Sequence, residues 1–139
     1  MSRRQDSDEH YVIDLCDEVL GSAGVRQATF DWLLGDASPT TRRAKKLPVD
    51  AYWPDLKIAV EFQEKQHTQP VAIFDRRETV SGVPRGDQRR LYDLRKSEQL
   101  PLHGITLITI HKHEFVTKGD KIVRGSARDI QIIRTRLSA

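Results

Sequence analysis

The sequence predicts an α/β domain in which a mixed central sheet is flanked by helices. Three features indicate this class: an amphipathic helical repeat over residues 8–20, two β-rich runs joined by a proline turn at 47–63, and a β-branched run at 105–110 that follows a second helix. The chain has 139 residues, of which 37% are apolar, enough to build one core. We therefore expect residues 1–139 to form a single domain.

Composition indicates in which cellular compartment the protein is expected. No apolar run approaches the ~18 residues of a membrane span, and the first residues lack the apolar stretch of a signal peptide. The single cysteine, Cys16, cannot form an internal disulfide, as suits a reducing compartment. The sequence thus predicts a cytoplasmic protein with no membrane partner.

Charge is distributed unevenly along the chain, whose net charge is +3. Residues 1–36 carry 3 Lys/Arg against 8 Asp/Glu, and residues 37–139 carry 20 against 12, so the two parts have net charges of −5 and +8. Residues 76–96 hold 7 Lys/Arg against 3 Asp/Glu, a local +4. Such a cluster suits a phosphate backbone, and a solvated helix face explains it equally well.

The first helix is expected over residues 8–20. Ser7 can cap it, its apolar positions recur at three-and-four spacing, and Gly21 is placed to end it. Asp14 and Glu18 stand four residues apart and therefore share a face away from the apolar stripe.

The next stretch is less regular. Residues 28–34 alternate apolar and polar side chains, which favours a strand over a short helix. Residues 35–40 are turn formers and are expected to form a loop, and residues 41–46 form a basic approach to the following element.

Residues 47–53 and 58–63 are rich in β-formers and flank a turn that contains proline, the pattern of a β-hairpin. A turn of even length, centred between residues 55 and 56, pairs Trp53 with Ile58. Each later pair along the two strands follows from this register.

This register places Asp50 opposite Glu61. Like charges directly opposite are destabilising, so the pair requires a compensating cation, a protonated carboxyl or a one-residue slip of the register. A divalent metal ion would resolve the repulsion. Because side chains alternate along a strand, Gln63 shares the face of Glu61, as do Lys65 and His67 if the strand continues.

The second half of the chain supplies the remaining elements. Residues 68–84 are expected to form a long, partly irregular loop, and residues 86–100 a helix that Pro101 and Gly104 terminate. The β-branched run at 105–110 is typical of a strand buried on both faces. A small hairpin over 115–123, turning at Gly119 and Asp120, and a last helix capped by Ser126 complete the prediction.

Several short motifs follow one another along this framework: Val49-Asp-x-Tyr, Ile58-Ala-Val-Glu-Phe, Gln66-His67, Tyr92-Asp-x-Arg95 and Gly104-Ile-x-Leu-Ile-x-Ile110. In this order they resemble the PD-(D/E)XK nuclease superfamily, above all its Vsr-like branch of small bacterial proteins. The resemblance implies a restriction endonuclease-like core in the order α-β-β-β-α-β. It also implies metal-dependent cleavage of phosphodiester bonds in DNA, by an endonuclease or a nickase.

The resemblance also implies roles for single residues. The metal-binding aspartate of the family falls on Asp50, and the acid that opens its Glu/Asp-x-Lys signature falls on Glu61. Gln63 stands at the lysine position, which leaves the usual cation missing. His67 keeps a histidine that members of this branch carry shortly after the acid.

Two further positions follow from the same resemblance. The acid that many members carry on the first helix would be Asp14 or Glu18, and the sequence does not choose between them. Asp93 and Arg95 fit the polar signature of the helix after the signature strand, where family members contact phosphate or support the site.

The residue types themselves also suit this chemistry. Phosphodiester hydrolysis needs an activated water and neutralised phosphoryl oxygens, and Mg²⁺ or Mn²⁺ on Asp50 and Glu61 would supply both. His67 or Lys65 could orient the water or stabilise the leaving oxygen, while Gln63 can position a water but carries no charge.

Nucleic-acid binding is assigned to the basic residues around the second helix, whose donors match phosphate: Arg85, Arg89, Arg90, Arg95 and Lys96. DNA is the expected partner, RNA is left open, and a homodimer would let two sites cut two strands.

Two other interpretations remain open. The absence of lysine at position 63 also fits a nucleic-acid-binding module that keeps the fold without turnover. A partner-dependent subunit, inactive alone, could instead dock the basic segment 76–96 on an acidic protein.

Overall fold

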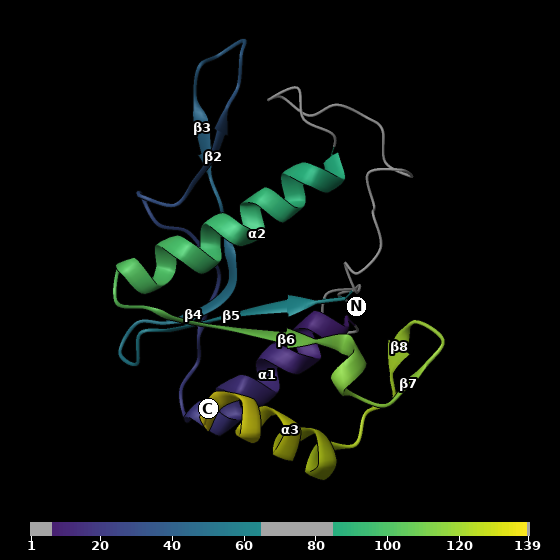
Figure 1. Cartoon of the computed structure of the whole chain (residues 1–139). Coiled ribbons are helices and arrows are strands. Elements are labelled where there is room, and N and C mark those ends of the chain that lie inside the picture. The colour runs from purple at the N-terminus through teal and green to yellow at the C-terminus, as the bar shows by residue number, and fades with distance from the viewer. Residues whose placement is uncertain (1–6, 65–84, 139) are drawn as a thin grey trace.

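A computed structural model of the chain describes residues 7–64 and 85–138, apart from the side chains of 85–87. Its elements, shown in Figure 1, are α1 (Asp8–Leu20), β1 (Val25–Ala28), β2 (Leu34–Ala37), β3 (Ala44–Lys46), β4 (Val49–Trp53), β5 (Ile58–Gln63), α2 (Arg85–Leu102), β6 (Thr106–His111), the 3₁₀ helix η2 (Lys112–Glu114), β7 (Thr117–Lys118), β8 (Lys121–Ile122) and α3 (Ser126–Ser138).

A four-stranded mixed sheet forms the centre of the fold. Its strand order is β1-β4-β5-β6, with β4 antiparallel to both β1 and β5, and with β5 parallel to β6. Figure 1 shows α1 and α3 on one side of this sheet and α2 on the other. The expected α/β class with a mixed sheet flanked by helices is confirmed.

Helix α1 follows its sequence signals. The hydroxyl of Ser7 accepts a hydrogen bond from the amide of His10 at 3.0 Å, and Gly21 ends the helix in the left-handed region at φ 77°. Val12 and Cys16 are fully buried against the sheet. Burial raises the pKa of the Cys16 thiol to about 12, so this cysteine is a neutral core residue.

The prediction of a strand over residues 28–34 is wrong. Strand β1 ends at Ala28, and the chain then turns, with the amide of Leu33 donating to the carbonyl oxygen of Phe30 at 3.2 Å. The aromatic residues serve packing instead, because the rings of Phe30 and Trp32 stack with centroids 4.8 Å apart and Trp32 stacks in turn on His103.

The predictions of a loop at 35–40 and of a basic approach at 41–46 are also wrong, because this stretch contains two strands. Strands β2 and β3 pair with each other in an antiparallel two-stranded ribbon, which is separate from the main sheet. Figure 1 shows this ribbon projecting beyond α2.

The hairpin of β4 and β5 has the predicted register. Trp53 pairs with Ile58 and Ala51 with Val60, so the turn is centred between residues 55 and 56 as expected. Trp53 is 1% exposed, and its indole nitrogen donates to the carbonyl oxygen of Ser22 at 2.9 Å, which ties the hairpin to the end of α1.

Helix α2 ends slightly later than expected, at Leu102, so Pro101 lies within its last turn and does not terminate it. Gly104 follows the helix in the left-handed region at φ 77°. Strand β6 is not buried on both faces as predicted. On one face Ile108 and Ile110 are buried, whereas Leu107, Thr109 and His111 on the other face are only partly buried. The reason is that Ile108 and Ile110 pack in the core with α1 and α3, whereas the opposite face, which carries Leu107, is only partly covered.

The small hairpin and the last helix occur as predicted, except that Ser126 is the first residue of α3 and not its cap. Strands β7 and β8 form the small hairpin, and Ile133 of α3 is fully buried in the core. The loop expected at 68–84 lies outside the described residues. Within 7–64 and 85–138, we find no helix with the length and apolar character needed to cross a membrane.

Candidate functional site

Two carboxylates meet where β4 and β5 lie side by side. The register that pairs Ala51 with Val60 brings Asp50 opposite Glu61, as predicted. The amide of Asp50 donates to Oε2 of Glu61 at 3.0 Å, and the amide of Phe62 donates to Oδ2 of Asp50 at 2.7 Å. Each carboxylate therefore accepts a backbone hydrogen bond from the opposite strand, which fixes the position of both.

Lys96 of α2 provides a cation for this pair. Its Nζ lies 2.6 Å from Oε1 of Glu61, and the two side chains are only 13% and 8% exposed. The observed register excludes the one-residue slip that the repulsion of Asp50 and Glu61 had left open. The compensation comes from a residue that the sequence had assigned to nucleic-acid binding.

The environment of Glu61 also changes its acidity. Burial raises the pKa of the Glu61 carboxyl to about 7; the charge of Lys96 acts against this rise and the charge of Asp50 adds to it. Near neutral pH the carboxyl therefore exchanges between a protonated and an ionised form. Such a group can respond to a cation or a proton that reaches the site.

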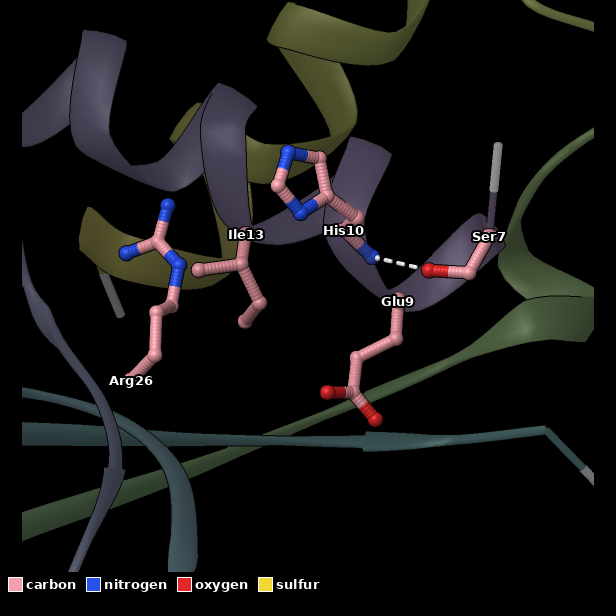
Figure 2. A pocket seen from close by; sticks show the side chains of 5 residues that line it. All are labelled: Ser7, Glu9, His10, Ile13 and Arg26. Carbon is pink, nitrogen blue, oxygen red and sulfur yellow. Dashed lines mark hydrogen bonds between the residues drawn. The ribbon is translucent and has the colours of Figure 1, made fainter. Parts of the chain in front are cut away.

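A third acid approaches the pair from α1. The side-chain nitrogen Nε2 of Gln27 donates to Oδ1 of Asp50 at 3.5 Å and to Oε2 of Glu9 at 3.3 Å, so one side chain bridges two carboxylates. Gln27 adopts φ 50°, a left-handed conformation that is unusual outside glycine. Figure 2 shows the Glu9 side chain extending from α1 toward the sheet.

Glu9 also lines a small pocket of about 120 Å³ between α1 and the start of β1, together with Ser7, His10, Ile13 and Arg26. The two acids expected on the first helix lie elsewhere. Asp14 pairs with Arg26 at 2.9 Å, and Glu18 is exposed. The acid of α1 that Gln27 links to Asp50 is Glu9, and no signal in the sequence indicated this link because it is entirely tertiary. The role expected for Asp14 or Glu18 stays a prediction.

The remaining predicted catalytic positions follow β5. Gln63 is half-buried, lies two residues beyond Glu61 on the same face, and pairs with His111 of β6. Lys65 and His67 lie outside the described residues. Their predicted roles stay predictions.

The basic residues of α2 divide into two groups. Arg89 and Arg90 are exposed, whereas Arg95 donates to the carbonyl oxygen of Leu34 at 2.9 Å and to Oδ1 of Asp36 at 3.1 Å. These bonds give Arg95 a structural role at the base of the ribbon, and a phosphate contact by it stays a prediction. The roles predicted for half-buried Asp93 and for Arg85, whose side chain is not described, also stay predictions.

The donor set decides which metal ion would suit this site. Carboxylate oxygens are the ligands that hard divalent cations take. In the described part of the chain, no three His, Cys, Asp or Glu side chains gather closely enough to hold a metal. Asp50 and Glu61 alone offer two carboxylates, and Mg²⁺ is commonly bound through one or two carboxylates with water and phosphate oxygens in the rest of its shell.

Comparison of the chain with protein-family models, curated proteins and solved structures finds no match.

Proposed function

We propose that this chain is a metal-dependent nuclease with a restriction endonuclease-like core, which hydrolyses phosphodiester bonds in DNA. The observation that carries the proposal is the facing pair of Asp50 and Glu61, held by reciprocal backbone hydrogen bonds. The order of the elements around the sheet, α1, β1, β4, β5, α2 and β6, supports the fold assignment.

Asp50 and Glu61 would hold Mg²⁺ or Mn²⁺. When bound, such an ion neutralises charge on the phosphoryl oxygens and lowers the pKa of a coordinated water. The chain contributes the orientation of both carboxylates, because each is already tied to the opposite strand. Gln27 and Glu9 add to this orientation at Oδ1 of Asp50.

Lys96 supplies the cation that Gln63 cannot. The signature lysine of the family would stand on the same strand as Glu61, whereas Lys96 reaches Glu61 from α2. Its charge favours the ionised form of Glu61, which is the form that binds a metal ion. The amide of Gln63 keeps the role of positioning a water by hydrogen bonding.

One observation favours a nucleic-acid-binding module without turnover as a second candidate function. Oε1 of Glu61 already contacts Lys96, and Oε2 accepts the amide of Asp50. Both oxygens are thus satisfied by the chain itself, so the buried carboxylate has a stable arrangement that needs no ion.

Nicking of supercoiled plasmid DNA with Mg²⁺ or Mn²⁺ separates these functions. We expect the wild-type chain to nick the plasmid and the variants Asp50→Asn and Glu61→Gln to lose about 100-fold or more of this activity. Asp55→Asn is the matched control, because Asp55 is exposed in the turn of the same hairpin. DNA that is retained but never nicked, with either ion, would instead identify the binding module.

A further inference from the structure

A basic ribbon stands beside α2, outside the main sheet. Among the described strands, β2 and β3 pair only with each other. Figure 1 shows the ribbon projecting past α2. Between residues 37 and 49 the chain carries no acid but has four exposed cations: Arg42, Arg43, Lys45 and Lys46.

Most of this charge makes no contact that stabilises the described part of the fold. Lys46 pairs with Asp31 at 2.7 Å. The side chains of Arg42, Arg43 and Lys45 make no ion pair or hydrogen bond with any described residue. Exposed cations without internal partners attract anionic ligands, and their clustering on one short ribbon concentrates this attraction.

The base of the ribbon is fixed to α2. Arg95 binds the backbone of Leu34 and the side chain of Asp36, and the amide of Asp36 donates to the hydroxyl of Tyr92 at 2.8 Å. A Cβ added to Gly35 would lie 2.9 Å from the Tyr92 hydroxyl, so this close contact needs glycine. The cations therefore lie on a ribbon whose base is already fixed to α2 before any ligand binds.

A groove runs from the ribbon toward the carboxylates. A hollow of about 770 Å³ lies between the ribbon and α2, and its lining includes Arg43, Lys45 and Lys46. A second hollow of about 320 Å³ extends along α2 to Arg89 and Lys96. The two hollows share Leu47, Pro48, Gln88 and Tyr92. Lys96 lines the second hollow and its Nζ contacts Glu61, so the groove reaches to within one side chain of the candidate active site.

We propose that the ribbon and this groove bind the sugar-phosphate backbone of a DNA strand and lead it to Asp50 and Glu61. The nature of the ligand rests on the proposed function, whereas the binding surface is additional to it. Charge complementarity favours this occupant. The ribbon part of the groove is lined by Arg43, Lys45 and Lys46 against one acid, Asp36, which pairs with Arg95. The part along α2 is lined by Arg89 and Lys96 against one acid, Asp93. Contacts of this kind position a strand without reading its sequence.

Binding of a fluorescent DNA duplex, followed by anisotropy in EDTA over a range of salt concentrations, tests the proposal without cleavage. The ribbon variant is Arg42→Gln/Arg43→Gln/Lys45→Gln. Its matched control is Lys118→Gln/Lys121→Gln/Arg134→Gln, which removes the same charge from exposed positions on β7, β8 and α3.

We expect the ribbon variant to bind about tenfold more weakly or worse at about 50 mM salt, and its salt slope to fall by about 2 to 3, since each lost phosphate contact lowers the slope by about 1. The control should bind within about threefold of wild type. If the triple ribbon variant does not fold by circular dichroism, Arg43→Gln and Lys45→Gln are measured singly.

Equal losses in the two variants, no loss in the ribbon variant, or no duplex binding by wild type would overturn the ribbon proposal. Ribbon-dependent binding by a chain that nicks no plasmid would support the ribbon and refute the nuclease. Plasmid nicking that survives in the ribbon variant at unchanged affinity would do the reverse.

Discussion

Lys96 of α2 contacts Glu61 of β5 across 35 residues of sequence, with 2.6 Å between Nζ and Oε1. The contact joins the helix to the strand that carries half of the candidate metal site. It also places a positive charge beside a carboxyl whose burial raises its pKa to about 7. The ionisation of Glu61 thus depends on a residue from another element, and this dependence can be measured.

Replacing Lys96 with methionine should destabilise the chain most at alkaline pH. Without its partner the buried carboxylate of Glu61 is uncompensated when ionised, which costs about 3 kcal/mol, and less when it is protonated. Urea unfolding at about pH 6 and about pH 9 measures the difference. Adding Glu61→Gln to Lys96→Met should restore part of the loss at high pH, and a loss that is equal at both pH values would contradict this account.

The stability of the wild-type chain should fall as pH rises from about 4.5 to about 7 through Glu61. The pKa of Glu61 is higher in the folded chain than its ordinary value of 4.5, so the folded state binds this proton more tightly than the unfolded state. The contribution is therefore complete below pH 4.5 and lost above the folded pKa. Glu61→Gln should remove this slope in urea unfolding across the same window, and Asp55→Asn should keep it.

Plasmid nicking should increase with pH around the pKa of Glu61, because a metal ion binds the ionised carboxylate. In Lys96→Met the same rise should move to higher pH, since the cation that favours ionisation is gone. The initial rate against pH measures both curves. An unchanged midpoint in the variant would show that Lys96 does not control the ionisation of Glu61.

Glu9→Gln should reduce nicking by about tenfold, whereas Glu18→Gln should leave it near the wild-type value. Glu9 and Asp50 are bridged by Gln27, and Glu18 is exposed further along the same helix. The two variants remove the same charge from α1, so initial rates at saturating Mg²⁺ compare position alone. Equal effects of both variants would assign the loss to net charge.

Tyr92→Phe should loosen the ribbon. The amide of Asp36 would lose its acceptor, at a cost of about 1 kcal/mol, while the core contact of the ring remains. Hydrogen exchange of the β2 amides should become faster, and Tyr52→Phe, on the main sheet, should not change it. Unchanged exchange in Tyr92→Phe would show that Arg95 alone fixes the ribbon.

Local patterns account for what the sequence predicted well. The first helix has its cap, its apolar repeat and its terminal glycine within a short, continuous stretch of chain. The register of β4 and β5 follows from the length of the turn between them, so the facing of Asp50 and Glu61 could be predicted from the spacing of residues alone. The prediction of a strand at 28–34 was wrong because Phe30 and Trp32 alternate with polar residues as in a strand, whereas in the structure their rings stack on each other within a turn.

The sequence by itself determined the helices, the central hairpin and the meeting of two acids across it, because these features depend on neighbours along the chain. Only the tertiary structure decided which residues surround those acids. Lys96 and Glu9 reach them through the packing of α2 and α1 on the sheet, and the β2–β3 ribbon takes its place through contacts with Tyr92 and Arg95. Contacts between such distant segments depend on how helices dock, and no local spacing in the sequence encodes that.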